Sequence, residues 1–109
     1  MLASEVLAKA RAHVAGGWHE PLSLDAGGRI CTHADEGISR YCLLDALLAA
    51  SHGDLDAMFA AEAVLVAQLR HAGWDAPMYR WLERNGRTHR EVLQLLTKSH
   101  AHAVAKESR

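Results

Sequence analysis

Residues 42–53 read CLLDALLAASHG, and this stretch predicts the central helix of the fold. Its leucines and alanines occupy almost the whole helical circumference, which is typical of a helix touched on several sides. With the residues before it, the stretch predicts a helix over 35–51, with Asp35 and Glu36 in the positive first turn. The apolar positions at helical spacing in this segment are Ile38, Tyr41, Cys42, Leu44, Leu48 and Ala49.

Two amphipathic helices flank this segment in the sequence. The first is predicted over residues 4–15, with Ser4 as its N-cap. The other is predicted over residues 55–72, with Asp54 as its cap. Apolar residues recur at three- and four-residue steps in both segments, so each helix has one face for the core.

The last third of the chain predicts a short helix and a long one. The short helix starts near Pro77 and ends before Asn85. The long helix starts at Thr88, which with Glu91 has the spacing of a capping box. A polar tail is expected after Val104. The residues of the long helix that are predicted to face inward are Val92, Leu95, Leu96, Ser99 and Ala103.

The segment between the first two helices, residues 18–34, is the least helical part of the chain. Leu22 and Leu24 alternate with polar residues, and the DAGG stretch that follows is a turn signal. These features predict a short β-hairpin. The alternative is an irregular loop that Trp18 pins to the core.

Length and composition set the fold class. The chain has 109 residues, of which half are hydrophobic and less than a quarter are charged, so one domain over residues 1–109 can bury a core. The predicted class is all-α: a compact bundle of four to five helices with an irregular or short β-hairpin segment between helices 1 and 2. The ordered core is expected to span about residues 4–104.

The apolar runs are short and interrupted by acids, so no membrane segment is predicted. Charged residues near the N-terminus are unlike a signal peptide, so a cytoplasmic location is expected. The net charge of −1 hides an asymmetry. Residues 1–76 hold five Lys/Arg and ten Asp/Glu, whereas residues 77–109 hold seven Lys/Arg and three Asp/Glu. A basic end of this kind indicates either a nucleic-acid footprint or a solvated helix face.

One aromatic and four arginines gather in this basic third, and they are the predicted binding residues. Arg80 and Arg84 are four residues apart on the short helix, while Arg87 and Arg90 flank the start of the long one. With Tyr79 they form a surface that suits an acidic protein partner or phosphate groups.

The chain has two cysteines, Cys31 and Cys42. A zinc site could combine them with His33 and His19, but zinc sites usually contain closely spaced ligand pairs. A disulfide is rare in the expected compartment, and a catalytic thiol needs a partner histidine. We interpret the cysteines as unrelated, Cys42 in the core and Cys31 in a loop. No metal and no cofactor are predicted.

Two polar features within helical segments are left open. Asp45 interrupts the LLDALL run and could face solvent, pair with an arginine or act as a functional carboxylate. His100 and His102 are two residues apart, so on a helix their side chains diverge and a surface role is favoured.

The order of short motifs along the chain resembles domain-of-unknown-function family 6197, small proteins of actinobacteria, other bacteria and their phages. The matching residues cover roughly 5–103 and are Gly17-Trp18, Leu22, Leu24-Asp25, Gly28-Arg29, Tyr41-Cys42, Ala46-Leu47, Trp81, Gly86-Arg87-Thr88 and Glu91-Val92-Leu93. The family usually has a small residue where Asp45 stands, and an Asn-Asp pair where this chain has Leu82-Glu83. The resemblance implies a compact helical domain and a mobile-element origin, and it implies no reaction.

The leading functional expectation is a non-enzymatic protein-interaction module that meets an acidic partner. One concrete form is a phage- or mobile-element-encoded inhibitor of a host or defence complex, of the anti-CRISPR kind. The first alternative is nucleic-acid binding through the basic third. The second is a small metal- or thiol-dependent enzyme at residues 19–42. Homodimerisation is left open.

Overall fold

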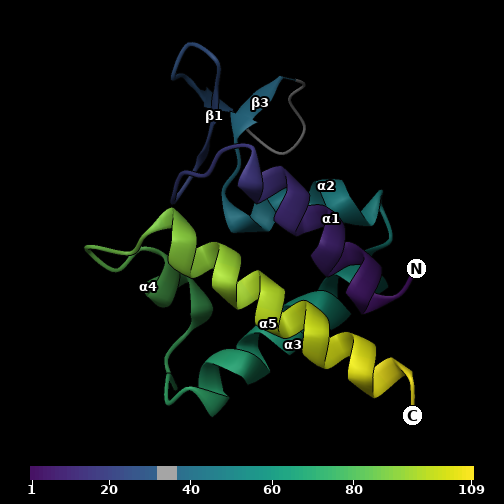
Figure 1. The fold of residues 1–109 in the computed structure, drawn as a ribbon. Helices are drawn as coiled ribbons and strands as arrows, with labels where there is room; N and C mark the ends of the chain where they lie inside the picture. The colour runs from purple at the N-terminus through teal and green to yellow at the C-terminus, as the bar shows by residue number, and fades with distance from the viewer. Residues whose placement is uncertain (32–36) are drawn as a thin grey trace.

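The computed structural model describes residues 1–31 and 37–109. Within these residues, five helices accompany a small antiparallel sheet that lies at one end of the molecule (Figure 1). The elements in chain order are α1 (Ala3–Ala15), β1 (Ser23–Asp25), β2 (Ile30–Cys31), β3 (Ile38–Arg40), α2 (Leu43–Ser51), α3 (Leu55–His71), α4 (Met78–Leu82) and α5 (His89–Glu107).

The helices share one hydrophobic core, in which α1 packs against α2, α3 and α5. Helix α2 packs mainly on α1 and α3, so α1 takes the central place that the sequence predicted for α2. Leu44 of α2 is 51% exposed, so α2 has one uncovered face. All five residues of α5 that were predicted to face inward are buried. No helix in the described part of the chain has the length and apolar character needed to span a bilayer.

The prediction for the start of α2 is wrong. The helix begins at Leu43, and Ile38–Arg40 form β3 instead of its first turns. Asp35 and Glu36, the predicted first-turn acids, lie outside the described residues. The fold is therefore mostly helical, but its strands are not confined to the short hairpin that the sequence predicted.

Pairing with β1 and backbone contacts from the residues after α1 explain why residues 38–41 are extended. The Tyr41 amide donates to the Gly17 carbonyl at 2.8 Å, and the His19 amide donates to the Tyr41 carbonyl at 3.1 Å. Gly17 is needed for this approach, because a Cβ atom there would lie 2.5 Å from the Ser39 carbonyl oxygen. These long-range hydrogen bonds override the helical periodicity of residues 38–42.

The predicted hairpin is present as β1 and β2, and its turn is the DAGG stretch. The Asp25 carboxylate accepts from the Gly27 and Arg29 amides, each at 2.9 Å, and Gly28 has a φ of 80°. Asp is typical of such turns because its carboxylate binds nearby backbone amides, and Gly because it adopts a positive φ at little cost. Strand β3 pairs with the other edge of β1, which gives the strand order β2-β1-β3.

Two predicted helix caps are confirmed. The Asp54 carboxylate accepts from the Ala57 amide at 3.1 Å at the start of α3. The Thr88 hydroxyl accepts from the Glu91 amide at 3.2 Å, and the Glu91 carboxylate accepts from the Thr88 amide at 2.9 Å. The second pair is the capping box of α5.

The two ends of the chain lie on the same side of the molecule (Figure 1). Ser4 is not the N-cap of α1, which is Leu2. Instead, the Ser4 amide and hydroxyl both donate to the Glu107 carboxylate. Helix α5 therefore continues to Glu107, beyond Val104, where the sequence predicted a polar tail.

Ser23 connects the sheet to the start of α2. Its hydroxyl donates to Asp45 Oδ2 at 2.6 Å and accepts from the Cys42 amide at 2.9 Å. The side chains of these three residues are buried, so Asp45 does not face solvent. Cys31 stands opposite Ser23 in the β1–β2 register and is also buried. Cys31 therefore lies in β2, and the expectation that it lies in a loop is wrong.

We expect Ser23→Ala to destabilise the fold by about 1–3 kcal/mol, because it leaves the buried Asp45 carboxylate and Cys42 amide without this partner. Ser39→Ala is the matched control, since Ser39 is an exposed serine of the same sheet, and should stay within about 0.5 kcal/mol. Urea unfolding of both variants measures the difference. Equal free energies of unfolding would contradict the role assigned to Ser23.

Candidate functional site

Four of the five predicted binding residues are exposed where α4 adjoins the N-terminal end of α5 (Figure 1). Tyr79 and Arg80 lie on α4, Arg84 lies in the turn after it, and Arg90 lies in the first turn of α5. The Tyr79 side chain is 56% exposed. Within residues 1–31 and 37–109, no carboxylate forms an ion pair with these arginines. We call these four residues the arginine ridge.

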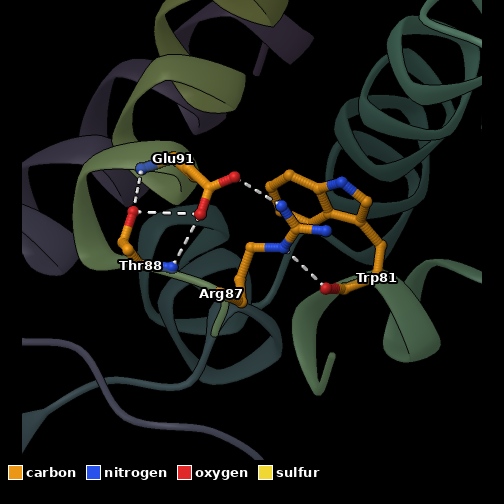
Figure 2. A network of polar contacts seen from close by, with 4 residues as sticks. All are labelled: Trp81, Arg87, Thr88 and Glu91. Carbon is orange, nitrogen blue, oxygen red and sulfur yellow. Dashed lines mark hydrogen bonds and ion pairs between the residues drawn. The ribbon is translucent and has the colours of Figure 1, made fainter. Parts of the chain in front are cut away.

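Arg87 behaves differently from the rest of the predicted set (Figure 2). Its Nε donates to the Trp81 carbonyl at 2.8 Å, and its guanidinium carbon lies 3.7 Å from the centre of the Trp81 ring. Its Nη1 forms an ion pair with Glu91 Oε2 at 2.6 Å. The guanidinium is therefore engaged within the protein, and it fastens α4 to the first turn of α5.

The capping box of α5 completes this network. The other Glu91 oxygen accepts from the Thr88 amide and hydroxyl. The hydrogen bond from the Thr88 amide is the main cause of the lowered pKa of Glu91, to which the Arg87 charge also contributes. The turn between α4 and α5 is thus tied to α4 through the Trp81 carbonyl and to α5 through the capping box.

A further basic site extends the ridge toward α1. Arg11, Arg90 and Lys98 line one surface depression of about 350 Å³. Arg11 is placed there because its Nε donates to the Thr97 hydroxyl at 2.7 Å. Arg11 is not evident as a site residue from the sequence, because it lies 79 positions before Arg90 (90 − 11) and only helix packing brings the two together.

The acidic residues of α5 do not offset the positive charge of Arg11, Arg90 and Lys98. Glu91 is held by the capping box and Arg87, and Glu107 is held by Ser4 at the other end. Arg90 and Lys98, two exposed cations of the same helix, form no ion pair with another described residue. The outer surface of α5 is therefore basic.

A groove of about 350 Å³ lies between α2, α3 and α4 and has the opposite charge. We call it the acidic-rimmed groove, and its lining residues are Glu20, Pro21, Leu44, Leu47, Glu62, Val66, Met78, Tyr79, Leu82 and Glu83. Most of the lining is apolar, three residues are acidic and none is basic. Tyr79 therefore belongs both to the groove and to the arginine ridge.

Glu20 is a half-buried carboxylate of the groove that accepts two hydrogen bonds. Its Oε2 accepts from the Trp18 indole Nε1 and from the Leu43 amide, each at 2.8 Å, and the second bond caps the start of α2. Burial raises the pKa of Glu20, and the nearby charge of Glu83 acts in the same direction. This role of Glu20 is not evident from the sequence, because no local motif connects residue 20 to a helix that begins at residue 43.

The cysteine region shows no activated thiol at Cys42. Burial raises the pKa of the Cys42 thiol, whereas a nucleophilic cysteine needs a lowered pKa. His33 lies outside the described residues, and His19 Nδ1 lies 2.7 Å from the Leu22 carbonyl oxygen. Among residues 1–31 and 37–109, no group of three or more His, Cys, Asp or Glu side chains is arranged to hold a metal ion.

The chain belongs to DUF6197, a family of unknown function, whose model matches residues 1–102. This match confirms the resemblance seen in the sequence. No curated protein and no solved structure matches the chain. Several residues that carried the resemblance have structural roles here: Gly17 contacts β3, and Arg87, Thr88 and Glu91 form the network of Figure 2.

We expect Arg87→Ala to lower the free energy of unfolding by about 1–2 kcal/mol, because it removes a charged hydrogen bond to the Trp81 carbonyl and the cation–π contact. Arg84→Ala, an exposed neighbour, is the control and should change stability by less than about 0.5 kcal/mol. Thermal and urea unfolding test both variants. Similar effects at the two positions would show that Arg87 is an ordinary surface arginine.

Proposed function

We propose that this member of DUF6197 is a non-enzymatic protein-interaction module that binds an acidic surface of a partner through the arginine ridge. The observation that carries the proposal is the exposure of Tyr79, Arg80, Arg84 and Arg90 together, without ion-pair partners among the described residues. Tyrosine and arginine are enriched among the residues that dominate binding energy at protein interfaces.

The anchoring of α4 to the start of α5 beneath the ridge supports the same proposal. Arg87 holds α4 against α5 through the Trp81 carbonyl, the Trp81 ring and Glu91. A surface that is already ordered before binding loses less conformational entropy when the partner arrives. In this proposal Arg87 acts as a positioning residue under the ridge, while its four neighbours make the contacts.

The finer form of the proposal is an inhibitor of a host or defence complex, of the anti-CRISPR kind. This form is supported by the occurrence in phages that the family resemblance implies. An inhibitor of this size acts by occupying a surface that a macromolecular complex needs, and a basic ridge suits an acidic surface. The identity of the captured partner tests this form directly.

We expect tagged protein to capture a stoichiometric partner from host-cell lysate, with or without nuclease, as read by mass spectrometry. Arg84→Glu/Arg90→Glu should weaken that binding more than tenfold, because two like-charge contacts replace two attractive ones. Lys9→Glu/Arg70→Glu changes the net charge equally at two exposed positions outside the ridge, and should retain binding within about threefold.

Two results would contradict the proposal. Turnover of a substrate by the purified protein would show an enzyme, and equal loss of binding in both double variants would show a nonspecific charge effect. Circular dichroism of each variant separates loss of binding from loss of fold. Partners that vanish with nuclease would move the assignment to nucleic acid.

Nucleic-acid binding is the second candidate, and the depression shared by Arg11, Arg90 and Lys98 favours it. Phosphate contacts release counterions, so the affinity must fall with salt by a slope of about 0.7–0.9 per phosphate in a log–log plot. The clustering of three cations around a hydroxyl is suited to backbone phosphates, which are recognised without reading sequence.

This second function predicts that Arg11→Gln/Lys98→Gln lowers the salt slope by about 1.4–1.8 for a labelled DNA or RNA strand, because two phosphate contacts are lost. Fluorescence anisotropy between about 50 and 200 mM salt measures it. Lys9→Gln/Arg70→Gln is the control with the same change in charge. A flat salt response of the unmodified protein would remove this candidate.

A further inference from the structure

The acidic-rimmed groove is a concave surface that the arginine ridge does not explain. Its apolar part comes from three helices, through Leu44 and Leu47 of α2, Val66 of α3, and Met78 and Leu82 of α4. Its volume of about 350 Å³ is within the range of sites that take a small ligand or a few side chains.

Two apolar side chains of the groove remain open to solvent. Leu44 is 51% exposed and Tyr79 is 56% exposed, although both line the groove. Covering such side chains removes apolar surface from water, which favours binding. The groove therefore favours an occupant with an apolar side chain.

The charge of the rim restricts the occupant further. Glu20, Glu62 and Glu83 all line the groove, and no basic side chain among the described residues forms an ion pair with them. Both hydrogen bonds to Glu20 end on Oε2, and no described residue donates to its Oε1. An acidic peptide or a nucleic-acid strand would meet like charge here.

We infer that the acidic-rimmed groove binds a segment of a partner protein in which an apolar side chain stands next to a lysine or arginine. The apolar side chain lies on Leu44, Leu47 and Met78, and the cation meets the three carboxylates. This inference goes beyond the proposed function, because it assigns a second surface with the opposite charge preference. Tyr79, at the border of both surfaces, would contact partners at either one.

The probe for this site is a dye-labelled, 14-residue amphipathic peptide made of leucine and lysine. Two comparison peptides replace either every lysine with glutamate or every leucine with serine. We expect saturable binding of the leucine–lysine peptide by fluorescence anisotropy, and at least tenfold weaker binding of both comparison peptides, because each lacks one of the two features that the groove recognises.

Variants of the chain locate the binding. Glu62→Gln/Glu83→Gln should weaken the peptide at least tenfold, whereas Asp56→Asn/Asp75→Asn, with the same change in net charge outside the groove, should stay within threefold. Leu44→Ser should also weaken it severalfold. Leu55→Ser is its control, since Leu55 is also 51% exposed and does not line the groove.

Three outcomes would overturn the inference: no saturable binding of the leucine–lysine peptide, equal weakening by the groove and control variants, or preference for the glutamate peptide. The Arg84→Glu/Arg90→Glu variant separates this inference from the proposed function. It should lose the acidic partner while it retains the peptide, so each proposal can fail without the other.

Discussion

The hydrogen bond from Ser23 to the buried Asp45 carboxylate is the interaction on which the joint between sheet and helices depends. The same hydroxyl accepts from the Cys42 amide, so one side chain joins β1 to the first turn of α2. All three groups are buried, so water cannot replace a missing partner. Breaking one of these hydrogen bonds therefore costs more free energy than breaking an exposed one. Glu20 adds a second tie to the same helix start through the Leu43 amide. These contacts place the groove wall and the sheet relative to the helical core.

The charge distribution of the molecule depends on which carboxylates form hydrogen bonds or ion pairs within the protein. Glu91 is held by Thr88 and Arg87, and Glu107 is held by Ser4, so α5 presents its cations outward. Of the three glutamates of the groove, Glu20 precedes β1, Glu62 lies on α3 and Glu83 follows α4. None of them forms an ion pair with a basic side chain among the described residues. A chain with a net charge near zero thereby carries two surfaces of opposite sign. Such a molecule is suited to contact partners by complementary charge, which sets association rate and specificity more than affinity.

Sequence reasoning succeeded where local chemistry decides and failed where distant contacts decide. The caps at Asp54 and Thr88 and the turn at Asp25 were predicted, because each is satisfied by residues within four positions. The start of α2 was not, since periodicity alone favoured a helix through Ile38–Arg40 and the pairing with β1 overrode it. For the candidate site, the exposure of Tyr79 and its arginine neighbours followed from their polarity, whereas the internal role of Arg87 depended on where Trp81 packs.

By itself, the sequence determined the helical class, most helix limits, the inward face of α5 and the family of the chain. Helical periodicity and capping are local properties, so they can be read from neighbouring residues. Only the tertiary structure decided that Asp45 is buried against Ser23, that Arg11 joins Arg90, and that three glutamates surround one groove. The physical reason is that these arrangements join residues far apart in the chain, and their free energy comes from packing and burial that no local pattern encodes.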